Sequence, residues 1–138
     1  MGKEKPQGKF DIVFVDAPCS GSGTWRRSPD QRFALTREKL ATYIAAQSEL
    51  LAEGATLVKP GGRLVYITCS LFLAEAEDQI TAFRKAHPGW RALVYRGILQ
   101  GRGLKVLPES GSALKDCLLL TPGAHGSDGF FVAILEKL

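Results

Sequence analysis

The sequence predicts an α/β fold in layers, with a mainly parallel sheet and a last antiparallel strand. Nearly continuous apolar runs alternate along the chain with segments whose apolar side chains recur every three or four residues. Runs of the first kind are typical of strands buried on both faces of a parallel sheet, and the others are typical of helices that cover it. Near the carboxyl terminus, two further apolar segments flank a turn-rich stretch, as in an antiparallel pair.

The first half of the chain is predicted to hold two strands with a helix between them. Residues 10–16, FDIVFVD, form an apolar run before Pro18 and predict a central strand. A helix is expected from Thr36, which can cap its amino terminus, to the sequence KPGG at 59–62, which stops it. Residues 62–69, GRLVYITC, are rich in β-branched and aromatic side chains and predict a second buried strand.

The second half begins with another amphipathic helix that ends at the sequence PG, residues 88–89. Its apolar face is expected to consist of Leu73, Ala76, Ile80, Phe83 and His87. Residues 90–114 contain scattered glycines and show no lasting period, so we predict irregular structure there. Residues 116–122 and 129–138 then predict two strands joined by a long hairpin-like loop.

Length and composition indicate one ordinary domain of a soluble, cytoplasmic protein. The chain has 138 residues, of which 45% are hydrophobic, and it lacks both the roughly 20 consecutive apolar residues of a membrane helix and a secretory signal. Three cysteines at positions 19, 69 and 117 fit neither a disulfide framework nor a zinc site, so we expect reduced thiols and no metal. The net charge of +4 is compatible with a nucleic-acid partner.

An acid and two thiols follow the two predicted parallel strands. Asp16 and Cys19 come after the first strand, and Cys69 ends the second. Because the carboxyl ends of neighbouring parallel strands meet at one edge of the sheet, we expect these three side chains to face one crevice. The dipole of the helix that follows Cys69 is expected to lower the pKa of this thiol and favour a nucleophile. The alternative is that both cysteines are small buried side chains without chemistry.

The segment TWRRSPDQRF, residues 24–33, interleaves basic and aromatic side chains. Arginines could hold a phosphate backbone while the aromatic rings stack on bases, although a solvated loop with ordinary charges is an equally good interpretation. The residues concerned are Arg26, Arg27, Arg32, Trp25 and Phe33.

Two other motifs do not carry their usual function here. The sequence GSGT at 21–24 resembles a dinucleotide-binding loop, but Arg26 occupies the place of the third glycine. His125 could pair with Cys69 in a cysteine hydrolase, although a histidine in a turn-rich loop is more often solvated than catalytic.

Three motifs in fixed order resemble the RNA 5-methylcytosine methyltransferase family, which includes the bacterial Fmu/Sun-type ribosomal RNA enzymes and eukaryotic nucleolar relatives. They are DAPCSGSG at 16–23, YITCS at 66–70 and SDGFFVAIL at 127–135. The resemblance covers most of residues 9–137. It implies the carboxyl-terminal half of a Rossmann-like methyltransferase domain that depends on S-adenosyl-methionine, with a ribosomal or transfer RNA as substrate and no membrane partner.

The resemblance also implies a role for each site residue. Cys69 would add to C6 of cytosine so that C5 can take up the methyl group, and Cys19 would serve the release of the product. Asp16 would hold the N3/N4 edge of the base and lie beside the cofactor, which Pro18 would also contact. The basic segment would contact RNA through Arg26, Arg27 and Arg32.

The sequence departs from the family pattern in two ways. Ala76 stands where the family usually has an asparagine between two glutamates. The strands that carry the glycine-rich cofactor loop in the family have no counterpart, so we expect residues 1–8 to be a leader or expression-derived segment and residues 9–138 a partial catalytic domain. Such a domain should bind cofactor weakly or not at all and be inactive alone. It should also self-associate through the exposed edge of the strand at 10–16.

A second hypothesis belongs to another class of protein. The motifs could persist in a non-catalytic module that keeps the methyltransferase fold and binds RNA or a partner chain through the basic segment at 24–33.

Overall fold

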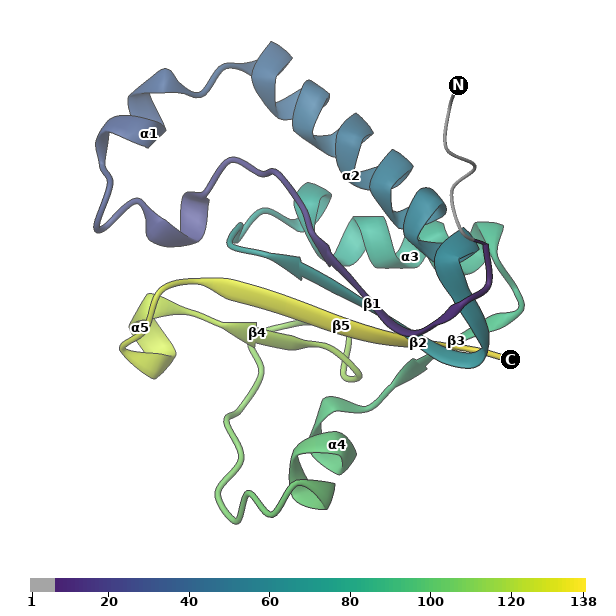
Figure 1. The fold of residues 1–138 in the computed structure, drawn as a ribbon. Coiled ribbons are helices and arrows are strands. Elements are labelled where there is room, and N and C mark those ends of the chain that lie inside the picture. The colour runs from purple at the N-terminus through teal and green to yellow at the C-terminus, as the bar shows by residue number, and fades with distance from the viewer. Residues whose placement is uncertain (1–6) are drawn as a thin grey trace.

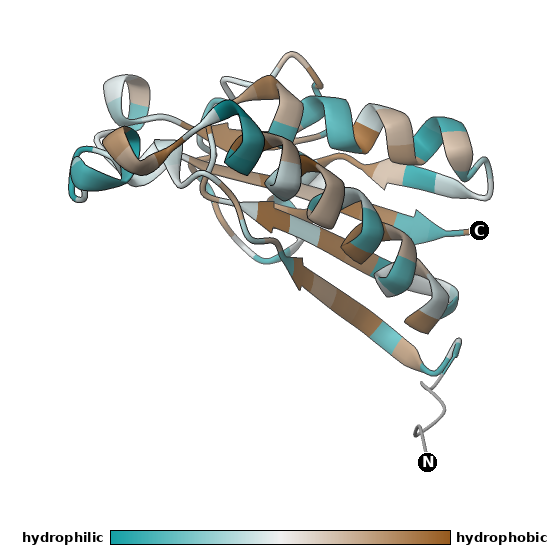
Figure 2. Cartoon of the chain, turned by 90° about the horizontal axis from the view of Figure 1, so that it is seen from above, coloured by the Kyte–Doolittle hydropathy of each residue, from teal (hydrophilic) through white to brown (hydrophobic). Residues whose placement is uncertain are grey.

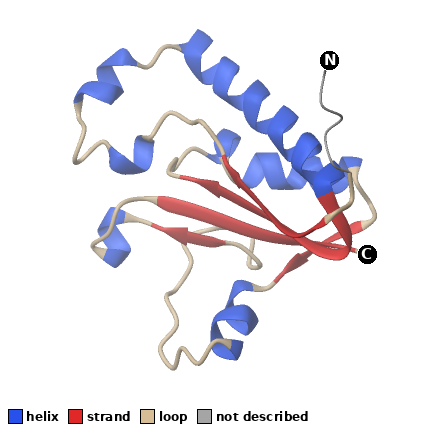
Figure 3. Ribbon diagram, in the orientation of Figure 1, coloured by secondary structure: helices blue, strands red, loops and turns tan. Residues whose placement is uncertain are grey.

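The computed structural model describes residues 7–138, so most of the expected leader at 1–8 lies outside the described residues. One mixed sheet runs through the centre of the described chain (Figures 1 and 3). Its strands are β1 (Phe10–Asp16), β2 (Val58–Thr68), β3 (Trp90–Leu93), β4 (Leu118–Leu120) and β5 (Phe130–Lys137).

The order of the strands is β1-β2-β5-β3, and β4 also pairs with β5. β1 and β2 are parallel, whereas β5 is antiparallel to β2, β3 and β4, so the four other strands share one direction. This confirms a mostly parallel arrangement whose last strand is antiparallel. The expected central position of β1 is wrong: within residues 7–138 it pairs with β2 alone and forms the edge of the sheet.

Helix α2 (Arg37–Leu57) forms where its signals predict it. The hydroxyl of Thr36 accepts a hydrogen bond from the backbone N–H of Lys39 at 3.1 Å, which satisfies a free donor of the first turn. The sequence KPGG does not form a separate stop, because the helix ends at Leu57 and β2 begins at once with Val58. Gly61 takes φ +76° inside this strand, a conformation that favours glycine.

The predicted second helix is divided into two parts. A 3-10 turn, η2 (Leu73–Glu75), precedes α3 (Glu77–Ala86), and Ala76 with φ −122° and ψ −97° separates them. The side chains of Ala76, Ile80 and Phe83 are buried, as the predicted apolar face requires, whereas Leu73 is exposed.

Residues 90–114 are not irregular throughout, contrary to the prediction. They contain β3 and the helix α4 (Tyr95–Gly101). A four-residue strand and a seven-residue helix are too short for periodicity to reveal them, and β3 is held by pairing with β5. The short elements η1 (Ser22–Thr24), α1 (Asp30–Ala34) and α5 (Pro122–His125) complete the structure, and α5 lies inside the loop predicted between β4 and β5.

The core lies between the sheet and the two longer helices, α2 and α3, which cover one face (Figures 1 and 2). Its fully buried side chains include Leu51, Leu64, Tyr66, Ile80 and Leu135. Alternation along β1 points Val13 and Val15 at α2, so Ile12 and Phe14 lie on the other face. Within residues 7–138 no helix is long and apolar enough to cross a membrane.

Candidate active site

The two thiols predicted to share a crevice are in direct contact. Cys19 follows β1 and Cys69 follows β2, and their Sγ atoms lie 3.3 Å apart. The parallel register places Asp16 opposite Ile67, and the N–H of Ala17 donates to the carbonyl of Ile67 at 3.1 Å. The strand ends are therefore aligned, so the loops that leave them start side by side.

Contact between the thiols separates their acidities. The pKa of Cys19 falls to about 6, chiefly because its thiolate accepts a hydrogen bond from Cys69, and further bonds from Thr68 and backbone N–H groups add to this against the effect of burial. The pKa of Cys69 is raised because its proton is held in that same bond, and burial and the charges of Cys19 and Asp16 act in the same direction. Near neutral pH the two sulfur atoms therefore share one proton.

This corrects the expectation that a helix dipole lowers the pKa of Cys69. The turn after Cys69 is the three-residue η2, and α3 begins only at Glu77, eight residues on. The dipole effect is confined to the first turn of a helix, so it does not reach the thiol of Cys69. The group in contact with this thiol is Cys19.

Asp16 and Pro18 lie exposed at the same strand end. The carboxylate of Asp16 forms no hydrogen bond or ion pair within the described chain, yet its charge raises the pKa of Cys69. An exposed and unengaged carboxylate close to a thiol is a suitable acceptor for the amino groups of a cytosine or of an amino-acid moiety. The expected single crevice is not formed: Cys19 lines a cavity of about 210 Å³ with Lys39 and Tyr43, whereas Asp16 lines a separate pocket between β1 and α2.

Two glycines join the loop before β5 to the two loops that carry Cys19 and Cys69, which we call the thiol loops. The N–H of Gly23 donates to the carbonyl of Cys69 at 2.8 Å, and the N–H of Gly129 donates to the carbonyl of Gly23 at 2.7 Å. A Cβ on Gly23 would lie 2.5 Å from the Gly129 carbonyl oxygen and 2.7 Å from that of Cys69. The sequence did not single out these glycines, because only the fold brings 23, 69 and 129 together.

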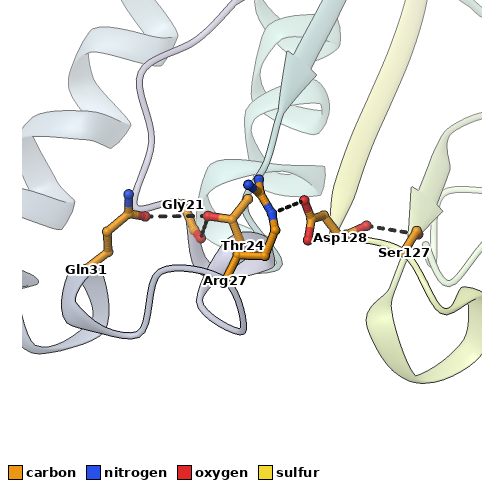
Figure 4. A network of polar contacts seen from close by, with 6 residues as sticks. All are labelled: Gly21, Thr24, Arg27, Gln31, Ser127 and Asp128. Atoms are coloured by element: carbon orange, nitrogen blue, oxygen red, sulfur yellow. Dashed lines mark hydrogen bonds and ion pairs between the residues drawn. The ribbon is translucent and has the colours of Figure 1, made fainter.

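The basic segment is fixed to the loop before β5 (Figure 4). Nε of Arg27 lies 2.7 Å from the carboxylate of Asp128, and the hydroxyl of Thr24 donates to the carbonyl of Gly21 at 2.8 Å. Arg27 is therefore engaged within the protein. Arg26 and Arg32 are exposed and have no ion-pair partner in the described part of the chain.

The aromatic residues of this segment differ in position. Trp25 packs edge-on against Phe72 with ring centroids 5.7 Å apart, and its Nε1–H donates to the carbonyl of Ser20 at 3.3 Å. Trp25 thus supports the thiol loop, while Phe33 is 85% exposed. Of the two rings, Phe33 has its surface free for a base.

The hydrolase interpretation fails on geometry. Nδ1 of His125 accepts from the N–H of Thr121 at 2.9 Å, and Nε2 contacts the carbonyl of Glu109, so both ring nitrogens are already engaged and neither is bonded to Cys69. Cys117 is fully buried, and this burial raises the pKa of its thiol to about 12. Residues 7–138 contain no cluster of side chains suited to a metal ion.

The sequence analysis did not identify Glu75 as a site residue. Its side chain is fully buried and accepts hydrogen bonds from Ser20 and Ser70, the neighbours of the two thiols.

Comparison with solved structures defines the class. The chain superimposes on a methyltransferase homologue from Pyrococcus horikoshii with a TM-score of 0.71 and 30% identity, over 94% of this chain and 40% of that one. The chain thus has a methyltransferase fold.

Sequence comparison defines the family. The family described as 16S rRNA methyltransferase RsmB/F matches residues 2–136, and the chain belongs to it. It is 39% identical over 137 residues to a probable ribosomal RNA small subunit methyltransferase B of Synechocystis, covering 99% of this chain and 29% of that protein. The corresponding protein of Bacillus subtilis is 37% identical, with 94% and 28% covered. The chain thus spans less than a third of each relative, and the family resemblance of its motifs is confirmed.

Proposed function

We propose that residues 9–138 are part of the catalytic domain of a ribosomal RNA methyltransferase that acts on C5 of cytosine and uses S-adenosyl-methionine. The observation that carries this proposal is the thiol pair, in which Cys19 and Cys69 touch at 3.3 Å and differ in acidity. Two half-buried cysteines at strand ends have no structural need to share a proton, whereas chemistry at C5 and C6 of a pyrimidine needs both a nucleophile and a base.

The proton that Cys19 and Cys69 share at rest gives each thiol a role in the reaction. As Cys69 adds to C6, its proton passes to the Cys19 thiolate in contact with it, and the electron pair of the C5–C6 double bond makes C5 nucleophilic. After methylation Cys19, having given its proton to water, takes the C5 proton. The double bond then re-forms and Cys69 leaves as thiolate. Asp16 accepts a hydrogen bond from the N4 amino group and so orients the base.

S-adenosyl-methionine, when bound, supplies the methyl group. The unengaged carboxylate of Asp16 and the exposed ring of Pro18 fit contact with the amino-acid part of this molecule. Because the chain spans under a third of its relatives, we infer that these 138 residues alone bind the cofactor weakly and are inactive. Tight binding of S-adenosyl-methionine by the isolated chain in titration calorimetry would contradict this.

The first experiment is covalent trapping on an RNA that contains 5-fluorocytosine. The chain is mixed with the upstream portion of the Bacillus subtilis relative, the RNA and S-adenosyl-methionine, and adducts are mapped by mass spectrometry. A base can remove hydrogen from C5 as a proton but cannot remove fluorine as a cation, so the covalent intermediate is trapped. We therefore expect an adduct on Cys69, and none with Cys69→Ser. The chain without the upstream portion is expected to give none.

Cys19→Ser serves as the matched variant in this assay. It should slow formation of the adduct, because the base for the Cys69 proton is lost, but it should block release more strongly, so that adduct also accumulates with ordinary cytosine. Absence of any adduct, together with RNA binding that depends on Arg26 and Arg32 and survives Cys69→Ser, would favour the non-catalytic module instead.

A further inference from the structure

A single buried carboxylate joins the two thiol loops from below. Glu75 is the last residue of η2, and its side chain has no exposed surface. No lysine or arginine among residues 7–138 forms an ion pair with it. A buried carboxyl group without a counter-ion needs several hydrogen bonds to be tolerated, and those of Glu75 come from both loops.

The loop that carries Cys19 supplies two of these hydrogen bonds. The backbone N–H of Ser20 donates to Oε1 of Glu75 at 2.9 Å, and the hydroxyl of Ser20 donates to Oε2 at 2.6 Å. Gln47 of α2 adds a third, because its Nε2 donates both to Oε1 of Glu75 at 3.1 Å and to the carbonyl of Pro18 at 2.9 Å. The residues on both sides of Cys19 are therefore held.

The loop that carries Cys69 binds the same carboxylate. The hydroxyl of Ser70, next to Cys69, donates to Oε2 of Glu75. The hydroxyl of Ser22 lies 3.1 Å from the Ser70 oxygen, and it accepts from the N–H of Leu71 at 2.7 Å. Since Ser70 uses its proton on Glu75, Ser22 is the donor to Ser70. The network therefore ends at one acceptor, Glu75. The two serines that donate to it, Ser20 and Ser70, each follow a cysteine of the pair in the sequence.

We propose that Glu75 is a positioning residue that holds the thiols of Cys19 and Cys69 in contact. Neither loop has a regular structure of its own at the thiols, and a carboxylate that accepts from Ser20 and Ser70 sets the distance between their neighbours. The consequence for proton transfer between the thiols rests on the proposed function. The contact itself does not, and it can be measured without cofactor or RNA.

The variant that tests this is Glu75→Gln. It keeps the shape of the side chain, but an amide has one acceptor oxygen, so four donors can no longer all be satisfied. The matched control is Glu77→Gln, two residues away. Glu77 is also buried, at 6% exposure, and accepts a hydrogen bond from the hydroxyl of Ser112 at 2.9 Å, but it contacts neither thiol loop.

The measurement is the equilibrium of the thiol pair with glutathione, made on the whole 138-residue chain carrying Cys117→Ala. Cys19 and Cys69 lose two protons and two electrons to form one S–S bond, while oxidised glutathione takes these up to give two thiols. The glutathione ratio at half oxidation gives the effective concentration of one thiol beside the other. We expect Glu75→Gln to lower this value about tenfold or more, and Glu77→Gln to change it less than twofold.

Urea unfolding of each variant separates positioning from general stability. An unchanged effective concentration in folded Glu75→Gln, or equal losses in both variants, would overturn the proposal. If Glu75→Gln does not fold, Ser70→Ala takes its place, since it removes only the hydrogen bond from Ser70 to Glu75. Ser70→Ala is expected to lower the effective concentration by a smaller factor, and an unchanged value would overturn the proposal. The glutathione measurement needs no methyl transfer. If Glu75→Gln lowers the effective concentration as expected but covalent trapping fails, only the proposed function is contradicted.

Discussion

At the scale of single residues, the site is governed by a proton that two sulfur atoms share. Cys19 is the more acidic partner because Cys69, Thr68 and backbone N–H groups donate to it. The pKa of Cys69 is raised by the same contact, and by burial and the charge of Cys19. In the proposed function, the nucleophile Cys69 would thus rest in contact with its own base, Cys19.

The acidity of Cys19 is therefore expected to depend on Cys69. With Cys69→Ala the strongest stabilising hydrogen bond of the thiolate is gone, so the pKa of Cys19 rises from about 6 toward its ordinary value. At pH 7 less thiolate is present, and alkylation by iodoacetamide slows several-fold. Rates followed by mass spectrometry between pH 5 and pH 9 give the midpoint.

Cys117→Ala is the control for this titration, because its buried thiol lies elsewhere and the profile should stay the same. A midpoint for Cys19 that does not move in Cys69→Ala would show that the contact between the sulfur atoms does not set its acidity.

At the scale of elements, three loops meet where β1, β2 and β5 present one end of the sheet. The backbone of Gly23 bonds to Cys69 on one side and to Gly129 on the other, and the pair of Arg27 with Asp128 closes the outer surface. These contacts leave no room for a side chain at Gly23. The loops are thus held by close approach of their backbones as well as by Glu75.

Gly23→Ala is expected to destabilise the fold by about 2–3 kcal/mol, because its Cβ would press on backbone atoms of both neighbouring loops and displace their hydrogen bonds. Urea unfolding followed by circular dichroism measures this. Gly97→Ala in α4, where a Cβ meets nothing within 4 Å, is the control and should be neutral or more stable by up to ~1 kcal/mol. Equal stability of the two variants would contradict the close approach.

At the scale of the whole molecule, the sheet is covered unequally. α2 and α3 pack over one face (Figures 1 and 2). On the other face, β1 leaves Ile12 and Phe14 exposed by 48% and 66%. β1 is also the sheet edge within the described residues. An apolar strand with unpaired backbone groups is a surface on which another strand can add.

We expect the chain to self-associate through β1. The double variant Ile12→Lys/Phe14→Lys places charges on this strand and should shift sedimentation toward the monomer. Val106→Lys, at a side chain that is 87% exposed and outside the sheet, is the control and should change nothing. A monomeric wild-type chain at high concentration would disprove the expectation.

The sequence by itself determined the family, the α/β class and the pairing of Cys19 with Cys69 at neighbouring strand ends. These follow from local signals: apolar runs, the cap at Thr36 and motifs of consecutive residues. Only the tertiary structure decided which thiol is acidic, which glycines touch and where the carboxylate of Glu75 lies, because each of these depends on atoms from segments some fifty or more residues apart. It also found β3 and α4, whose length is too short for a periodic pattern and whose stability comes from pairing and packing.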